Sequence, residues 1–297
     1  MKWRTLRAAV AHRLRDAGIE SPDTEARFIT EECSGHAGGE WLEIEDTDAI
    51  ARAEARVHAM CERRAAGEPL QYVLGSWAFR DLDLMVDSRV LIPRPETEIV
   101  VEVALDEAVR LGLRRAKARG AVPSAPTAVV ADLGTGSGAI ALALEHELPE
   151  VEVWATDASE DALAVARANL AGCGATRVRV APGSWFDALP RELRGWLTLV
   201  VSNPPYVAQH EVIALPPVVL DYEPRTALVA GPTGLEALTH LVDEAPAWLA
   251  PRGALVAELA PHQAADMVPY ARAAGFDDVT IRPDLTGRDR VLVARRG

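Results

Sequence analysis

The stretch Val200-Val201-Ser202-Asn203-Pro204-Pro205-Tyr206 joins an apolar run to a polar amide, two prolines and an aromatic ring. The run starts upstream at Leu197 and carries no charge, which is typical of a strand buried on both faces of a parallel sheet. The strand must end at Pro204, because neither proline has an N–H group for the sheet ladder. We therefore expect the backbone carbonyls here and the Asn203 side chain to accept hydrogen bonds from another molecule.

Such a cluster of acceptors at the carboxyl end of a strand suits a planar group that carries an NH2. The nitrogen lone pair of an amide or exocyclic amine is delocalised, so the nucleophile stays poor unless acceptors hold its hydrogens. The Tyr206 ring could stack on the plane of that group. Taken alone, the same residues also fit an ordinary exit from strand to loop, since Asn-Pro commonly opens a turn.

Length, charge and cysteine usage limit the classes of protein to which this chain can belong. The chain has 297 residues, 49% hydrophobic and 25% charged, as in soluble proteins, and its length suits two domains. Its net charge of −13 disfavours a phosphate backbone, so we expect no direct nucleic-acid substrate. The sequence shows no His/Cys grouping typical of a metal site and no apolar stretch of membrane-helix length. We expect a cytoplasmic monomer with reduced thiols, no metal and no membrane association.

The N-terminal part is predicted to be a small helical bundle. Trp3, Leu6, Val10 and Leu14 fall on one helical stripe, which favours a first helix over a targeting peptide. Gly18 supplies a stop for that helix. Helices are expected over residues 3–17, about 22–33 and about 48–66.

An alternating pattern from Trp77 to Leu84, then Val90-Leu91-Ile92, predicts a β-hairpin over 76–92 with its turn at Asp87-Ser88-Arg89. The hairpin would link two domains. The predicted division is 1–75 for the helical domain, 76–95 for the linker and 96–297 for the second domain.

From Ala128 onward, short apolar strands alternate with helical patterns, which predicts βαβ units and a mainly parallel sheet. The segment 118–127 is predicted to be a surface loop. The long loop over 207–232 borders the acceptor cluster and is a candidate lid or substrate wall. Strands are expected at 128–132, 151–155, 178–181, 197–201, 254–258, 279–282 and 290–294, and helices at 95–117, 140–148, 159–170, 235–249 and 262–274.

The segment Asp132-Leu133-Gly134-Thr135-Gly136-Ser137-Gly138-Ala139 follows the first of these strands. Its glycines let the backbone approach a ligand and present N–H groups at a helix N-terminus. Asp157, at the end of the next strand, suits the hydroxyl groups of a ribose. The same pattern fits dinucleotides, so the segment alone leaves NAD open.

Two features favour S-adenosylmethionine as the cofactor. Asp132 suits the ammonium group of a methionine moiety and would repel a pyrophosphate. The loop of Asn203 to Tyr206 accepts an amino nucleophile and is not a hydride site. Trp185 and Phe186 could flank the adenine, although core packing explains Phe186 equally well.

Together these motifs resemble the PrmC/HemK family, the protein-(glutamine-N5) methyltransferases that modify peptide chain release factors. The resemblance implies a class I S-adenosylmethionine-dependent methyltransferase fold, which is α/β and Rossmann-like with a mainly parallel seven-stranded sheet and an antiparallel last strand pair. An N-terminal helical domain that recognises the release factor and a hairpin linker would precede it. The implied substrate is the glutamine of the Gly-Gly-Gln loop. The matching stretches are 67–72, 91–98, 132–139, 202–206, 222–228 and 284–290.

The motifs and the resemblance assign the site. Residues expected to bind S-adenosylmethionine are Asp132, Gly134, Thr135, Gly136, Ser137, Gly138, Asp157, Trp185 and Asn203. Residues expected to bind the substrate amide are Asn203, Pro204, Pro205 and Tyr206, of which Asn203, Pro204 and Tyr206 are the expected catalytic residues. Three departures from the family pattern, at Ser184, Thr233 and Ala257–Ala260, are expected to lie away from the methyl-transfer site.

Other functions stay open at this point. The chain could methylate adenine N6 or the glutamine of another protein, since Asn-Pro-Pro-Tyr occurs in adenine methyltransferases too. It could be a cofactor-binding regulator without catalysis, or an NAD-dependent oxidoreductase. Arg288 could contact the loop over the site or cap a turn.

Overall fold

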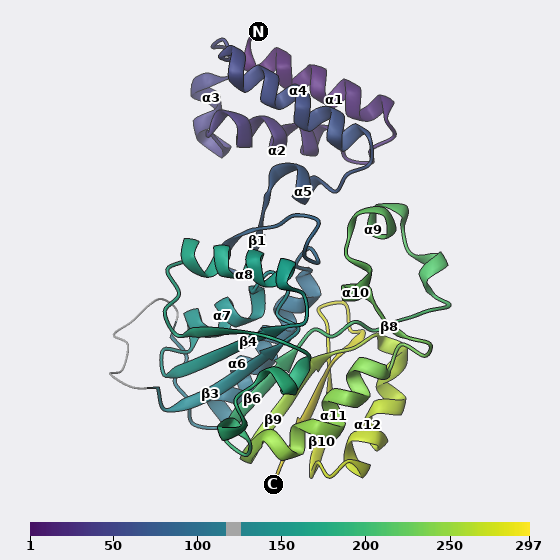
Figure 1. Ribbon diagram of the computed structural model, residues 1–297. Coiled ribbons are helices and arrows are strands. Elements are labelled where there is room, and N and C mark those ends of the chain that lie inside the picture. The colour runs from purple at the N-terminus through teal and green to yellow at the C-terminus, as the bar shows by residue number, and fades with distance from the viewer. Residues whose placement is uncertain (117–125) are drawn as a thin grey trace. The chain divides into compact units, whose positions relative to one another are not determined.

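The computed structural model describes residues 1–116 and 126–297, and the chain divides into two compact units (Figure 1). The helical unit comprises Met1–Trp77 and Pro217–Tyr222. The α/β unit comprises Ala78–Pro216 and Glu223–Gly297. The loop predicted over 118–127 lies almost wholly outside the described residues, as does the last residue of the helix predicted over 95–117.

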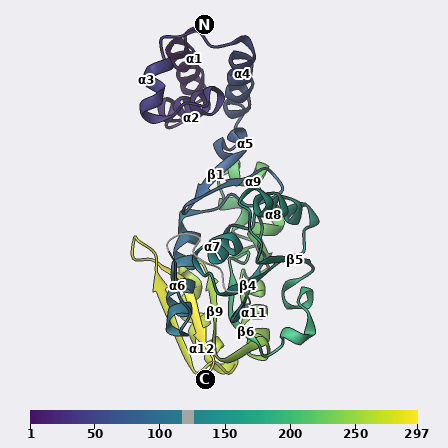
Figure 2. The ribbon, with the colours of Figure 1, turned by 90° about the vertical axis from the view of Figure 1, so that its left-hand side faces the viewer.

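The helical unit is built on α1 (Trp3–Asp16), α2 (Pro22–Ser34) and α4 (Ala51–Ala65), which pack against one another (Figure 2). The three predicted helices are thus confirmed. Pro22 opens α2, and Gly35 ends it with φ 72°, a conformation that glycine adopts without strain. The side chains that share its core include Leu6, Leu14, Ile29, Val57 and Met60.

Three short helical elements between Met1 and Trp77 were not predicted. They are η1 (Gly38–Glu40), α3 (Trp41–Ile44) and α5 (Leu70–Leu74). Each has at most five residues, which is too short to show a helical period in the sequence. Trp41 nevertheless contributes to the core, where its ring meets that of Trp3 edge to face at 6.2 Å between centroids.

The hairpin is present, but its predicted turn is wrong. β1 (Ser76–Phe79) pairs with β2 (Leu82–Met85), so the turn lies at Arg80 and Asp81. Arg80 has φ 52°, which is unusual for a residue other than glycine. Its N–H group donates to Glu98 Oε1 at 3.0 Å and its guanidinium binds Glu147 at 2.7 Å. These partners, which are distant in the sequence, stabilise the turn, so the residues around Arg80 alone do not predict its position.

The α/β unit contains a seven-stranded sheet in the order β10-β11-β9-β6-β3-β4-β5 (Figure 1). Neighbouring strands among β9, β6, β3, β4 and β5 are parallel, and β11 is antiparallel to both β9 and β10. The predicted mainly parallel sheet with an antiparallel last pair is confirmed. The strands are β3 (Ala128–Leu133), β4 (Val151–Asp157), β5 (Val178–Pro182), β6 (Leu197–Ser202), β9 (Leu249–Glu258), β10 (Asp278–Pro283) and β11 (Asp289–Arg295).

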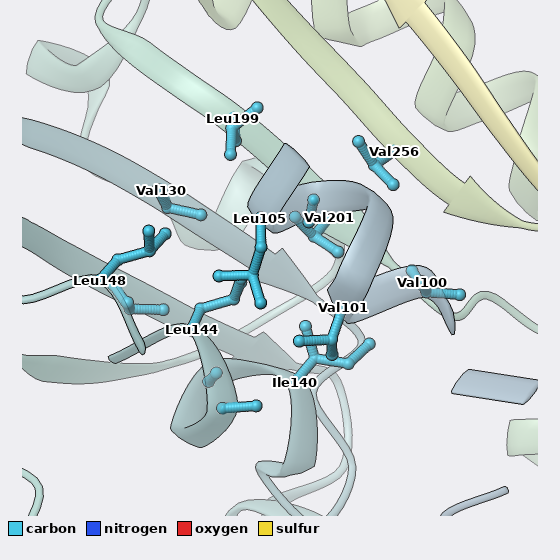
Figure 3. Close-up of a cluster of buried hydrophobic side chains, with 14 of the residues drawn as sticks. Val100, Val101, Leu105, Val130, Ile140, Leu144, Leu148, Leu199, Val201 and Val256 are labelled. Atoms are coloured by element: carbon cyan, nitrogen blue, oxygen red, sulfur yellow. The ribbon is translucent and has the colours of Figure 1, made fainter. Parts of the chain in front are cut away.

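Helices cover both faces of this sheet. On one face α6 (Pro95–Arg110) packs on β6 and β9, α7 (Ala139–Glu147) packs on β3, β4 and β5, and α8 (Glu160–Gly172) packs on β4 and β5. On the other face lie α11 (Glu236–Trp248) and α12 (Ala264–Ala273). Figure 3 shows the first core, whose labelled side chains are Val100, Val101, Leu105, Val130, Ile140, Leu144, Leu148, Leu199, Val201 and Val256.

The long loop predicted over 207–232 contains short elements. β7 (Val207–Ala208) pairs in parallel with β8 (Val229–Gly231), and between them lie η4 (Val212–Ala214), α9 (Pro217–Tyr222) and α10 (Arg225–Leu228). The remaining turns of 3-10 helix are η2 (Trp185–Ala188), η3 (Arg191–Leu193) and η5 (Pro261–Gln263). Among the helices of the described residues, none combines the length and apolarity that a membrane crossing requires.

Candidate active site

A cavity of about 420 Å³ lies in the α/β unit at the carboxyl ends of β3, β4 and β6. The chain runs from β3 outward to β5 and then returns to β6 on the other side of β3, so the cavity sits where the strand order reverses. Its volume is typical of small-molecule sites. The predicted site residues that line it are Gly134, Thr135, Gly136, Ser137, Asp157, Trp185, Asn203 and Pro205.

The glycine turn between β3 and α7 needs its glycines. Gly134, Gly136 and Gly138 have φ values of 75°, 55° and 84°, in the left-handed region that other residues adopt only with strain. A Cβ atom on Gly134 would lie 3.3 Å from the Trp185 ring. A Cβ atom on Gly136 would meet nothing within 4 Å, so the backbone there is open to a ligand.

Asp132 lies beneath this turn and is not part of the cavity wall. Its Oδ2 accepts hydrogen bonds from the Thr135 hydroxyl at 2.6 Å and from the Ala141 N–H group at 3.0 Å. Its Oδ1 is buried and has no hydrogen-bond partner in the described part of the chain. Burial raises the pKa of Asp132 to about 7. Asp132 therefore holds the turn, and its predicted contact with an ammonium group stays a prediction.

Asp157 and Trp185 form the wall on the side of β4 and β5. Asp157 accepts the N–H groups of Gly136 and Ser159, each at 2.9 Å, and its carboxylate keeps further lone pairs for hydroxyl groups. Phe186 instead stacks on Trp248 in the core, with 5.6 Å between ring centroids. The suggestion that Phe186 flanks the adenine is therefore wrong.

Asn203 follows β6 and reaches the cavity from the central strand. Its Nδ2 donates to Thr97 Oγ1 at 3.0 Å, and the Thr97 hydroxyl donates to Glu258 Oε2 at 2.8 Å. None of the described residues donates to Asn203 Oδ1. The end of β6 is fixed beside it, because Ser202 Oγ donates to the Leu133 carbonyl of β3 at 2.6 Å.

The loop after Asn203 is fixed by hydrogen bonds from the side chain of Gln263. Gln263 Nε2 donates to the Tyr206 carbonyl at 3.1 Å and to the Gly234 carbonyl at 2.9 Å. In the described part of the chain, no hydrogen bond reaches the Pro204 carbonyl. The Tyr206 phenol faces Glu258 and is not in the cavity wall, and burial raises its pKa. Substrate contacts by Pro204 and Tyr206 stay predictions.

Thr97 and Glu258 were missed as members of the site. Residues Ala257–Ala260 do not line the cavity, but Glu258 among them is linked to Asn203 through Thr97. The sequence carried no signal for this link, which depends on the register that places Ser202 of β6 opposite Ala257 of β9. Ser184, another departure, lines the cavity.

The last part of the wall comes from α10. Glu223 is buried, accepts the Ile92 N–H group at 3.2 Å and pairs with Arg94. These contacts set Pro224, Thr226 and Ala227 in the wall, so part of the predicted loop does form it. Of the two roles considered for Arg288, the structure shows the capping of a turn: its Nε donates to Asp284 at 3.0 Å in the turn before β11.

Comparisons with known proteins agree with this geometry. The family model described as PrmC N-terminal domain matches residues 5–75, and the one described as Methyltransferase small domain matches residues 104–215. The catalytic domain of hMettl16, solved in complex with a MAT2A 3'UTR hairpin, has a TM-score of 0.57 at 15% identity and covers 92% of this chain and 90% of that one. Fold and site define a class I S-adenosylmethionine-dependent methyltransferase.

Full-length relatives identify the family. A release factor glutamine methyltransferase from Deinococcus radiodurans is 39% identical over 296 residues, which is 100% of this chain and 99% of that protein. One from Bordetella pertussis is 41% identical over 279 residues, 94% of this chain and 96% of that protein. The chain belongs to the release factor glutamine methyltransferase family and is an enzyme that uses S-adenosylmethionine.

The residues of the cavity fit this donor. Open space above Gly136 leaves room for close approach to the backbone, and Asp157 offers acceptors to ribose hydroxyl groups. Asp132 Oδ1, which has no hydrogen-bond partner in the described part of the chain, could accept a further hydrogen bond beneath the same turn. Gly134, Gly136 and Trp185 would hold the remainder of the molecule.

Proposed function

We propose that this chain transfers a methyl group from S-adenosylmethionine to the side-chain N5 atom of the glutamine in the Gly-Gly-Gln loop of peptide chain release factors. Membership of the family supports the class of substrate. One observation in the site supports the chemistry. Because Nδ2 of Asn203 is committed to Thr97, its Oδ1 is left to accept a hydrogen bond at the cavity.

The donor supplies a methyl group activated by its attachment to a positively charged sulfur. The chain has to hold the weakly nucleophilic amide nitrogen in line with that group. Asn203 Oδ1 and the Pro204 carbonyl accept the two amide hydrogens, which orients the nitrogen lone pair and favours a more tetrahedral nitrogen in the transition state. A strong base is unnecessary, since the N–H proton becomes acidic once the nitrogen is alkylated. Transfer would be direct, with no covalent enzyme intermediate: the N–CH3 bond forms as the S–CH3 bond breaks, S-adenosylhomocysteine is the product, and the amide proton is released to solvent.

The helical unit is the proposed recognition module for the release factor. Its match to the family model for residues 5–75 supports this role, as does its separate core. A single loop of three residues offers little surface, so contacts outside the loop are needed for an ordinary protein–protein affinity. We place this reaction in the cytoplasm and assign it to a monomer.

Mass spectrometry tests the proposal. The enzyme is incubated with S-adenosylmethionine and a purified release factor, and a tryptic digest is analysed for a methylated glutamine in the loop. The control substrate is the same release factor with that glutamine replaced by alanine. A parallel reaction with DNA and RNA oligonucleotides tests adenine as the acceptor. Methyl transfer to adenine, or no modification of the glutamine, would refute the proposed substrate.

A further inference from the structure

The proposed chemistry does not use the buried carboxyl group of Glu258 at the end of β9. Its exposed fraction is 0%, and burial raises its pKa to about 7. Oε2 accepts the Thr97 hydroxyl, whereas Oε1 is buried and has no hydrogen-bond partner among residues 1–116 and 126–297. A carboxyl group in such a place costs stability, so packing does not explain its presence.

The hydrogen bonds that start at Glu258 run in one direction. The Thr97 hydroxyl has a single proton, which it donates to Glu258 Oε2 at 2.8 Å. Its oxygen is then the acceptor for Asn203 Nδ2 at 3.0 Å. Oε2 accepts this proton when the carboxyl is ionised or carries its own proton on Oε1, whereas a proton on Oε2 would be donated to Thr97 and would reverse both hydrogen bonds. The orientation of the Asn203 carboxamide is therefore set by a group two hydrogen bonds away.

We propose that Thr97 and Glu258 are positioning residues that hold the Asn203 carboxamide with its oxygen toward the methyl acceptor. This inference rests on the proposed function, because it explains how the site selects an NH2 group. With the carboxamide reversed, Nδ2 would face the incoming NH2 group, and two donors would oppose each other. The pair thereby discriminates a glutamine side chain from a glutamate of the same shape.

The test compares three variants of the full chain with the wild type. Thr97→Val keeps the shape and removes the hydroxyl, Thr97→Ser keeps the hydroxyl, and Glu258→Gln allows the position to donate as well as accept. The matched control is Thr280→Val in β10, where the buried hydroxyl has no hydrogen-bond partner among the described residues. Turnover and KM for the release factor are measured, together with S-adenosylmethionine affinity by calorimetry.

Thr97→Val should lower kcat on the order of 10- to 100-fold, since small misplacements of a positioning group have effects of that size. Thr97→Ser should restore kcat to within about threefold of wild type, and Glu258→Gln should fall between the two. S-adenosylmethionine affinity should change by less than about threefold in all of them. Normal kcat in Thr97→Val, or equal losses in the Val and Ser variants, would overturn the inference.

A spectroscopic readout separates this inference from the proposed function. The side-chain NH2 signals of Asn203 in a ¹H–¹⁵N spectrum, assigned by their loss in Asn203→Ala, should include one proton protected from solvent exchange. Thr97→Val should abolish that protection and Thr97→Ser should keep it. If the wild type fails to methylate release factors, the proposed function fails. Protection that persists in Thr97→Val would refute the positioning role, whatever the substrate.

Discussion

At the scale of single residues, the proposed chemistry depends on the carboxamide of Asn203. Replacing Asn203 by Ala removes an acceptor that is used most strongly in the transition state, so kcat should fall roughly 100-fold or more. The affinity for S-adenosylmethionine, measured by calorimetry, should stay within about threefold of wild type, because the glycine turn and Asp157 are untouched. Turnover close to the wild-type rate would show that Asn203 does not hold the substrate amide.

Two buried carboxyl groups predict an unusual dependence of stability on pH. Burial raises the pKa of Glu258 and of Asp132 to about 7 each, from unfolded values of roughly 4. The folded chain therefore retains these protons between about pH 5 and pH 7, and unfolding releases them. The free energy of unfolding should then fall as the pH rises through this window, by about 3 kcal/mol for each group.

The surroundings of Glu258 support this sign. It faces Thr97 and Glu96 from α6, Arg290 from β11 and the phenol of Tyr206. Arg290 is the only cation in that set, and the neutralising effect of burial outweighs it. Carboxylates with lowered pKa values, such as Asp284, lose their stabilising effect only below about pH 4. They therefore do not change the free energy of unfolding between pH 5 and pH 7.

Urea unfolding of the ligand-free enzyme between pH 5 and pH 8 measures this effect. The wild type should lose about twice as much stability across that range as Glu258→Gln, in which Asp132 is the one buried carboxyl group of the pair that remains. Equal losses in the two proteins would show that Glu258 does not titrate in this range. A wild-type stability that is flat with pH would contradict the prediction for both carboxyl groups.

At the scale of elements, the turn between β3 and α7 determines how closely a ligand can approach. Gly134→Ala adds a Cβ atom 3.3 Å from the Trp185 ring, at a φ of 75°. The backbone or the ring must shift, so the affinity for S-adenosylmethionine should fall about tenfold or more, at a cost in folding stability of about 1–2 kcal/mol.

The matched control for that change is Gly172→Ala at the end of α8, where an added Cβ meets nothing within 4 Å. This control should be stabilised by roughly 0.5–1 kcal/mol and should bind the donor normally. Calorimetry and urea unfolding of both variants make the comparison. Equal affinities in Gly134→Ala and wild type would show that the ligand does not depend on the conformation of this turn.

Long periodic elements could be predicted from the sequence, and contacts between distant residues could not. The strand before Asn203 and the helices of both units follow from local hydrophobic patterns. The turn at Arg80 could not be predicted, because its conformation is stabilised by Glu98 and Glu147. Similarly, the motifs located most of the cavity wall, but the link from Thr97 to Glu258 spans 161 positions and needs the sheet register.

At the scale of the whole molecule, the described residues fall into two compact units, and the helical unit has a hydrophobic core of its own. The helical unit has its own buried side chains, and the cavity lies entirely within the α/β unit. Chemistry and recognition are therefore separable in principle. Variants on the helical unit should affect a whole release factor without affecting a short peptide that carries the same glutamine.

Two exposed apolar side chains on the helical unit make this separation testable. Leu42 and Ile50 are 72% and 71% exposed, so replacing both by Glu should cost little stability. If this unit contacts the release factor there, KM for the whole release factor should rise about tenfold or more, as for loss of buried apolar contacts at an interface. Turnover at saturation and KM for the short peptide should stay near wild type.

The control for this prediction is Trp196→Glu, at a side chain that is 71% exposed and precedes β6 in the α/β unit. It adds one negative charge, half of what the double variant adds, at a similarly exposed apolar position outside the helical unit. KM for both substrates should be unchanged. A KM that rises equally in the Trp196 variant would reflect net charge alone, whereas unchanged kinetics in the Leu42 and Ile50 variant would remove these residues from the recognition surface.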